Sequence, residues 1–158
     1  MKRAWRIAAW IACLVLVGCS TGPVRRVSEP AASIQQLTVA ADGSWSLELR
    51  VQNYSSVPMR FDTVTVEVVV DDAQAGTLQA TPALTVGPES ADVLTLPLAP
   101  ASAARIALAN ALASGRGVGY RLGGTLRAAP ADRGGARDYP LKHASQLSPV
   151  PGLPGVLR

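Results

Sequence analysis

The chain has 158 residues, with 15 lysines and arginines, 11 aspartates and glutamates, and a hydrophobic content of 48%. This length suits one ordinary domain, and the apolar content is too high for an intrinsically disordered protein. One histidine and two cysteines exclude a zinc site built from several His and Cys ligands and a scaffold of several disulfides.

Residues 1–18 are predicted to be a lipoprotein signal peptide. A basic start precedes an apolar stretch from Ile7 to Val17, which is too short to span a bilayer. The stretch ends in Leu16-Val17-Gly18-Cys19, which resembles the lipobox of bacterial lipoproteins. We therefore predict cleavage before Cys19 and lipidation of its thiol. Cleavage also removes Cys13 and three of the 15 basic residues, so the remaining chain is nearly neutral and has no disulfide.

Ser20 follows the cysteine, and in bacterial lipoproteins a residue other than aspartate at this place favours sorting to the outer membrane. Stable anchoring needs more than one acyl chain, and such lipoproteins carry three. We expect a Gram-negative outer-membrane protein that is lipid-anchored on the periplasmic face and whose partner is the membrane itself. The alternative is an uncleaved signal anchor in which the cysteine has no role.

Beyond the anchor, residues 19–33 are predicted to be a tether, because they lack apolar periodicity. Residues 34–145 are predicted to form the folded domain. Apolar and polar residues alternate there with a period of two, which predicts strands at 45–52, 64–70, 94–98, 120–127 and 139–142. Turn residues separate them at 42–43, 53–58, 71–76, 87–88 and 133–135. Short strands with one apolar face predict a mostly β protein, an antiparallel β-sandwich. Pro97 predicts an edge strand or a bulge.

Residues 101–114 are rich in alanine and predict one short α-helix, with Ser102 as its N-cap and Gly115 at its end. The face expected to pack on a sheet carries Ile106, Ala109 and Leu112. Residues 146–158 contain several prolines and glycines and are predicted to be an extended or mobile tail rather than a strand.

The sequence predicts no catalytic constellation, metal site or cofactor. His143 is the only histidine and ends a predicted strand, where a solvated structural role is expected. Ser114 lacks the first glycine of a nucleophile elbow. The glycine-rich residues 115–119 precede a strand instead of a helix, so a turn is expected there and not a phosphate cradle.

Three further features have plainer explanations. Asp71 and Asp72 lack the ligand spacing of a calcium loop and are expected to form a turn. Aromatic residues such as Trp45 and Phe61 are too few for a stacking platform, so no nucleic-acid partner is expected. The pair of exposed arginines expected on one face could contact anionic lipid headgroups, although a solvated face is the default. These arginines are Arg121 and Arg127.

The order of the features carries a family resemblance. A strand ends at Asn53-Tyr54-Ser55, and Val57-Pro58-Met59-Arg60-Phe61 leads into a valine-rich strand. Beyond the predicted helix, Tyr120-Arg121-Leu122-Gly123-Gly124-Thr125-Leu126 follows. Over residues 34–145 this order resembles the late-embryogenesis-abundant group 2 family, also called the water-stress-and-hypersensitive-response (WHy) domain family, in its bacterial lipoprotein form. Of the family's Asn-Pro-Asn-like turn, the first asparagine is present.

The resemblance implies a sandwich similar to fibronectin type III and immunoglobulin-like domains. It also implies a non-enzymatic protein linked with desiccation and other stress, with no functional residue to add to Cys19. We therefore expect a lipid-anchored stress-protective or binding module. The alternative is an accessory lipoprotein of an envelope complex that transports lipid or assembles the cell wall, with an envelope protein or a lipid as its partner.

Overall fold

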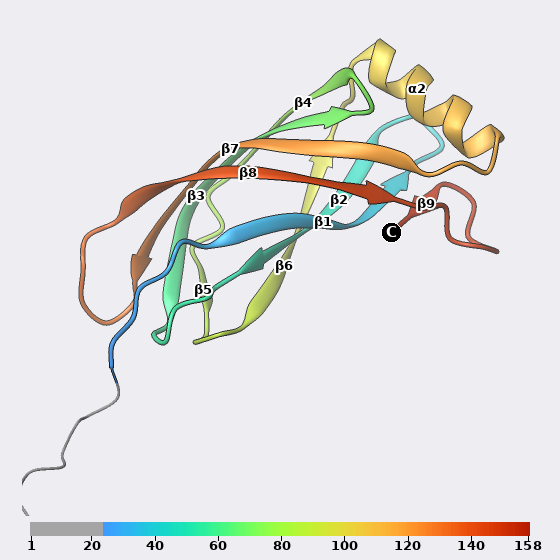
Figure 1. Cartoon of the computed structure of the whole chain (residues 1–158). Coiled ribbons are helices and arrows are strands. Elements are labelled where there is room, and N and C mark those ends of the chain that lie inside the picture. Colours follow the sequence, from blue (N-terminus) through green and yellow to red (C-terminus); the bar gives the residue numbers. More distant parts are fainter. Residues whose placement is uncertain (1–23) are drawn as a thin grey trace, which may run out of the picture.

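The computed structural model describes residues 24–158, so the predicted signal peptide, Cys19 and the first part of the tether lie outside the described residues. Strands make up 56% of the described residues. Within residues 24–158 they form two antiparallel sheets, accompanied by one helix (Figure 1). Within this part of the chain, no helix has the length and hydropathy needed to cross a bilayer. The prediction of a mostly β protein with one short helix is confirmed.

The first sheet has the strand order β6-β2-β1-β9. Its strands are β6 (Ala91–Leu98), β2 (Trp45–Gln52), β1 (Ala31–Val39) and β9 (Val156–Leu157). Every second residue of β2 is buried, from Trp45 to Val51, which confirms the predicted dry face. Pro97 lies in β6 at the edge of this sheet, where a missing backbone N–H costs no ladder hydrogen bond. The prediction of an edge strand there is confirmed.

The second sheet has the order β4-β3-β7-β8, and the short strand β5 also pairs with β3. Its strands are β3 (Met59–Val70), β4 (Ala73–Ala80), β5 (Leu84–Val86), β7 (Val118–Pro130) and β8 (Arg137–Leu147). The four alternating valines of β3, from Val64 to Val70, are fully buried. One continuous core contains the inner faces of both sheets and the buried side of the helix, so the arrangement is sandwich-like. The backbone N–H of Ile34 also donates a hydrogen bond of 3.2 Å to the Tyr120 hydroxyl, which links the two sheets.

The structure corrects three predictions about segment boundaries. The predicted turn over 71–76 is limited to Asp71 and Asp72, since β4 begins at Ala73 and pairs with β3. Strand β1 begins at Ala31, inside the segment predicted as tether. The tail was expected to be no strand, but Val156–Leu157 pairs with β1 as β9 because its backbone reaches the open edge of that strand. In each case, hydrogen bonds to a neighbouring strand hold the segment in an extended conformation that its local sequence does not predict.

Helix α2 (Ser102–Ala113) follows the prediction in length but not in detail. Its N-cap is Ala101 without a side-chain hydrogen bond, so Ser102 is not the cap. The C-terminal prediction holds: Gly115 has a φ of 62°, and backbone bonds from Gly115 to Leu112 and from the next residue to Ala111 close the helix.

The buried face of α2 also differs from the prediction. Its buried residues are Ala104, Leu108 and Ala111, whereas Ile106 is 61% exposed. Alanine side chains are small, so the face that carries Ala104 and Ala111 lets the helix backbone approach the sheets closely while Leu108 enters the core.

The two ends of the molecule are built differently (Figure 1). At one end the segment entering β1 lies against three loops: Arg25 bonds to Asp132, Arg26 bonds to Glu89, and the backbone N–H of Ser56 donates to the Arg26 carbonyl. At the opposite end lie α2, the β1–β2 hairpin and the C-terminal loop. The chain therefore enters the folded body far from the helix.

Asn53 is the centre of the entry end. It is fully buried, and its side-chain amide donates to the backbone carbonyls of Val57 (2.8 Å), Val86 (3.2 Å) and Gly87 (2.8 Å). Its Oδ1 accepts a hydrogen bond of 2.8 Å from the backbone N–H of Ser55. One side chain thus holds together the loops that precede β3 and β6. This explains physically why an asparagine begins the turn that carries the resemblance.

Candidate functional site

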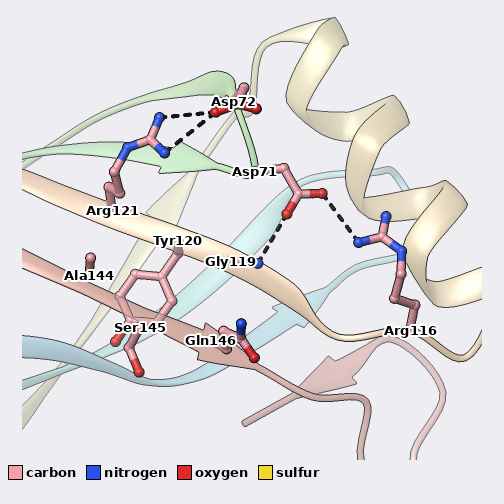
Figure 2. A pocket seen from close by; sticks show the side chains of 9 residues that line it. All are labelled: Asp71, Asp72, Arg116, Gly119, Tyr120, Arg121, Ala144, Ser145 and Gln146. Atoms are coloured by element: carbon pink, nitrogen blue, oxygen red, sulfur yellow. Dashed lines mark hydrogen bonds and ion pairs between the residues drawn. The ribbon is translucent and has the colours of Figure 1, made fainter.

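A depression of about 640 Å³ lies where the β3–β4 turn meets the start of β7 and the end of β8. Figure 2 shows its lining: Asp71, Asp72, Arg116, Gly119, Tyr120, Arg121, Ala144, Ser145 and Gln146. The depression is shallow and polar. The sequence marks the two aspartates and Arg121 as candidates, but it does not indicate that they line one depression.

Asp71 ties the β3–β4 turn to the loop after α2. Its Oδ1 accepts a hydrogen bond of 3.0 Å from the backbone N–H of Gly119, and its Oδ2 lies 3.5 Å from the Arg116 guanidinium (Figure 2). The backbone N–H of Asp71 in turn donates to the Gly119 carbonyl at 2.7 Å. Both carboxylate oxygens therefore already have partners from the chain itself. The glycine run is a helix-to-strand turn, as expected.

Asp72 lies apart from Asp71. Its side chain is 98% exposed, and its Oδ1 is 3.4 Å from Nη2 of Arg121. The two carboxylates engage different arginines (Figure 2). This geometry confirms the prediction that they are turn residues.

Tyr120 closes the floor of the depression. Its ring is buried, and burial raises the pKa of its hydroxyl, against the opposing effect of the hydrogen bond from the Ile34 backbone. The hydroxyl is thus a protonated structural group that holds β1 at neutral pH. His143 packs against the same ring at a tilt, with 5.8 Å between ring centroids. It is half-buried on β8 and does not line the depression.

The other residues weighed for chemistry are placed as follows. Trp45 and Phe61 are buried in the core, so neither offers a ring face for a base to stack on. Arg127 pairs with Asp138 at 3.1 Å on the outer face of the second sheet. Across residues 24–158, no group of three or more His, Cys, Asp or Glu side chains could hold a metal ion. The depression therefore brings together ion pairs and a structural tyrosine, a set suited to stabilising a turn.

The different exposure of the two aspartates gives a direct test. Asp71→Ala is expected to lower the free energy of unfolding by about 1 kcal/mol, because the Gly119 N–H loses its acceptor. Asp72→Ala removes only an exposed ion pair and should change stability by less than about 0.5 kcal/mol. Urea unfolding of the two variants measures both. An equal effect would show that Asp71 has no special structural role.

Comparison with known proteins identifies the domain. The family model described as "Late embryogenesis abundant protein" matches residues 48–144, from β2 to β8. Two solved structures resemble the chain at low identity. A crystal structure of a protein from Archaeoglobus fulgidus is 16% identical, with a TM-score of 0.44 over 79% of this chain and 98% of that one. A solution structure from Arabidopsis thaliana is 13% identical, with a TM-score of 0.49 over 80% of this chain and 81% of that one. No curated protein sequence matches the chain significantly.

Proposed function

Since the chain belongs to the late embryogenesis abundant protein family and is a stress-related protein of that type, we propose that it is a non-enzymatic protective module held at the bacterial envelope by lipid on Cys19. The family is generally non-enzymatic. The ion-paired depression agrees with this, because its carboxylates are engaged by the chain's own donors. We propose further that the two sheets form a sandwich of the fibronectin type III kind.

One observation carries the envelope location: Leu16-Val17-Gly18-Cys19 stands at the end of a short apolar stretch that a basic start precedes. The geometry of the body is compatible with such an anchor, since the chain enters at the end opposite α2 (Figure 1). At that entry end, Arg25, Arg133 and Arg137 line a depression of about 180 Å³. Cationic side chains near an anchor favour contact with anionic headgroups. The anchored body would then expose its α2 end to the periplasm.

Cys19→Ser tests the anchor. In a Gram-negative host grown with radiolabelled palmitate, the parent chain is expected to carry label and to fractionate with the outer membrane. The variant should lose the label and keep the first 18 residues, because its hydroxyl cannot accept the diacylglyceryl group. Cys13→Ser is the matched control and should be processed normally. Label on the Cys19→Ser chain, or an unlabelled parent beginning at Met1, would contradict the proposal.

Protection is tested separately. A client enzyme dried with the purified protein is expected to keep more activity after rehydration than the same enzyme dried with albumin at equal mass. The outer faces of the strands are mostly polar and can replace lost water as hydrogen-bond partners while the core stays closed. Equal recovery with albumin would contradict the protective role.

A stoichiometric envelope partner recovered by crosslinking at native abundance would favour the alternative, an accessory subunit of a lipid-transport or wall-assembly complex.

A further inference from the structure

The small depression at the chain-entry end has a cationic wall, and in the described part of the chain no acidic side chain lines it. Its volume is about 180 Å³, below the usual range of about 300–1,000 Å³ for pockets that enclose a whole small molecule. Its wall includes Arg25 and Val27 from the chain entry, and Arg133, Arg137 and Tyr139 from the β7–β8 loop and the start of β8. We call this depression the entry pocket. Its size and its guanidinium groups suit one anionic group, such as a phosphate, that belongs to a larger molecule outside.

One carboxylate lies close to the entry pocket, that of Asp132. Nη2 of Arg25 donates to its Oδ1 at 3.0 Å. The pKa of this carboxyl is lowered, first by a hydrogen bond from the Arg133 backbone N–H and then by the nearby charges of Arg25 and Arg133. Asp132 is therefore ionised at neutral pH and balances one of the three arginines.

The other two arginines keep an excess of positive charge. Within residues 24–158, neither Arg133 nor Arg137 forms an ion pair. Asp138, the neighbour of Arg137 in β8, pairs instead with Arg127 at 3.1 Å. The preceding residues 1–23 contain no aspartate or glutamate that could supply a counter-charge. The entry pocket thus has two arginines more than the single carboxylate can neutralise.

The segment that leads into β1 is fixed to the body beside this pocket. The backbone N–H of Arg26 donates to the Ser56 hydroxyl at 2.9 Å, and the backbone N–H of Ser56 donates to the Arg26 carbonyl at 3.0 Å. Two residues further on, the backbone N–H of Ser28 donates to the Ser55 hydroxyl at 3.0 Å. Together with the bond from Arg25 to the β7–β8 loop, these contacts attach the chain to the body well before β1 begins.

This attachment limits how far the entry pocket can lie from an anchor at Cys19. Arg25 is six residues beyond Cys19, and six fully extended residues span at most about 22 Å. Apolar side chains are also exposed at this end, since Val24 is 82% and Val27 is 43% exposed. Arginines beside exposed apolar side chains are typical of a surface that meets the membrane interface.

We propose that the entry pocket binds the phosphate of an anionic phospholipid headgroup and so docks the lipid-anchored body on the membrane surface. The phosphate oxygens accept hydrogen bonds from the guanidinium groups of Arg133 and Arg137. This inference rests on the proposed anchor at Cys19, to which it adds a second and charge-dependent contact. The body is then held with its entry end on the membrane instead of turning freely on its anchor.

The test uses the mature lipidated chain, purified from a Gram-negative host and inserted into vesicles. Ala131→Cys carries a fluorophore on the exposed loop beside the entry pocket, and Ala109→Cys carries the same label on the exposed face of α2. In the proposed mature chain Cys13 is absent and Cys19 is acylated, so each variant has one reactive thiol. Acrylamide, a neutral quencher dissolved in the water, measures how far each label is shielded.

Both labels are expected to be open to acrylamide in phosphatidylcholine vesicles. When about 30% of the lipid is phosphatidylglycerol, quenching at residue 131 should fall about twofold, while quenching at residue 109 should not change. About 1 M salt should restore the quenching, because the Debye length is then only about 3 Å. A label at residue 131 that is quenched equally in both kinds of vesicle would overturn the headgroup site.

The double variant Arg133→Gln with Arg137→Gln should lose the shielding that phosphatidylglycerol gives. Arg105→Gln with Arg116→Gln removes the same charge from exposed positions near the opposite end and is the matched control, which should keep the shielding. Shielding that survives the loss of Arg133 and Arg137 would refute the proposal. A parent chain that floats with neither kind of vesicle would instead contradict the anchor on which the site rests, so the two failures are distinguishable.

Discussion

Gly124→Ala is expected to lower the free energy of unfolding by about 3–5 kcal/mol, the sum of backbone strain and overpacking. Gly124 lies in β7, the strand between β3 and β8, and has a φ of 149° that alanine rarely adopts. A Cβ placed there would lie 2.1 Å from the Thr65 carbonyl oxygen of β3. Backbone on a paired strand cannot move aside, so the whole strand must shift.

Gly123→Ala is the matched control for this prediction. The two glycines are adjacent in the same strand, yet a Cβ on Gly123 meets nothing within 4 Å. Its φ is not positive, so alanine there should change stability by less than about 1 kcal/mol. Chemical denaturation followed by circular dichroism measures both. If Gly124→Ala were as stable as Gly123→Ala, the close approach of β3 and β7 would be wrong.

Asn53→Ala is expected to cost about 3–4 kcal/mol, because it removes four hydrogen bonds from a fully buried position at the chain-entry end. Of the groups left without a partner, the Val86 carbonyl and the Ser55 N–H are also buried. The substitution also removes the link between the loops before β3 and β6. The rate of amide hydrogen exchange should therefore rise more in these loops than near α2.

Asn110→Ala is the control for Asn53. Asn110 is exposed on α2, and none of the side-chain hydrogen bonds in the described residues starts from its amide. Alanine favours a helix, so this variant should be as stable as the parent or slightly more stable. Thermal unfolding of the two variants decides the matter. A loss below about 1 kcal/mol for Asn53→Ala would mean that the loops do not depend on its amide.

The sequence predicted some elements well and missed others for a definite reason. Strong alternation of large apolar residues, as in β2 and β3, identified buried faces correctly. Strand β4 was missed because Ala73, Gln74 and Gly76 have weak strand preference and its buried residues, Ala75 and Leu78, are three apart. A register shift opposite, between Val68 and Val69, accounts for this spacing. No pattern of period two could have revealed it.

The candidate sites show the same limit. Local sequence correctly assigned Asp71 to a turn, but not its bond to Gly119, which is 48 residues away. Alternation likewise placed Trp45 in the core, whereas nothing in the pattern marks its indole N–H as lacking an acceptor. The sequence does not single out Arg105, because an arginine on an alanine-rich helix is ordinary. The structure places its side chain next to Gly43 of the β1–β2 hairpin.

By itself the sequence determined that residues 24–158 form a mostly β domain with one helix, because these features depend on the order of nearby residues. Only the tertiary structure decided which face of α2 is buried, that β9 completes the first sheet, and which polar atoms meet. Those outcomes depend on contacts between residues far apart in the chain. Hydrophobic periodicity carries no information about such contacts, since it indicates which side of an element is buried but not which residues pack against that side.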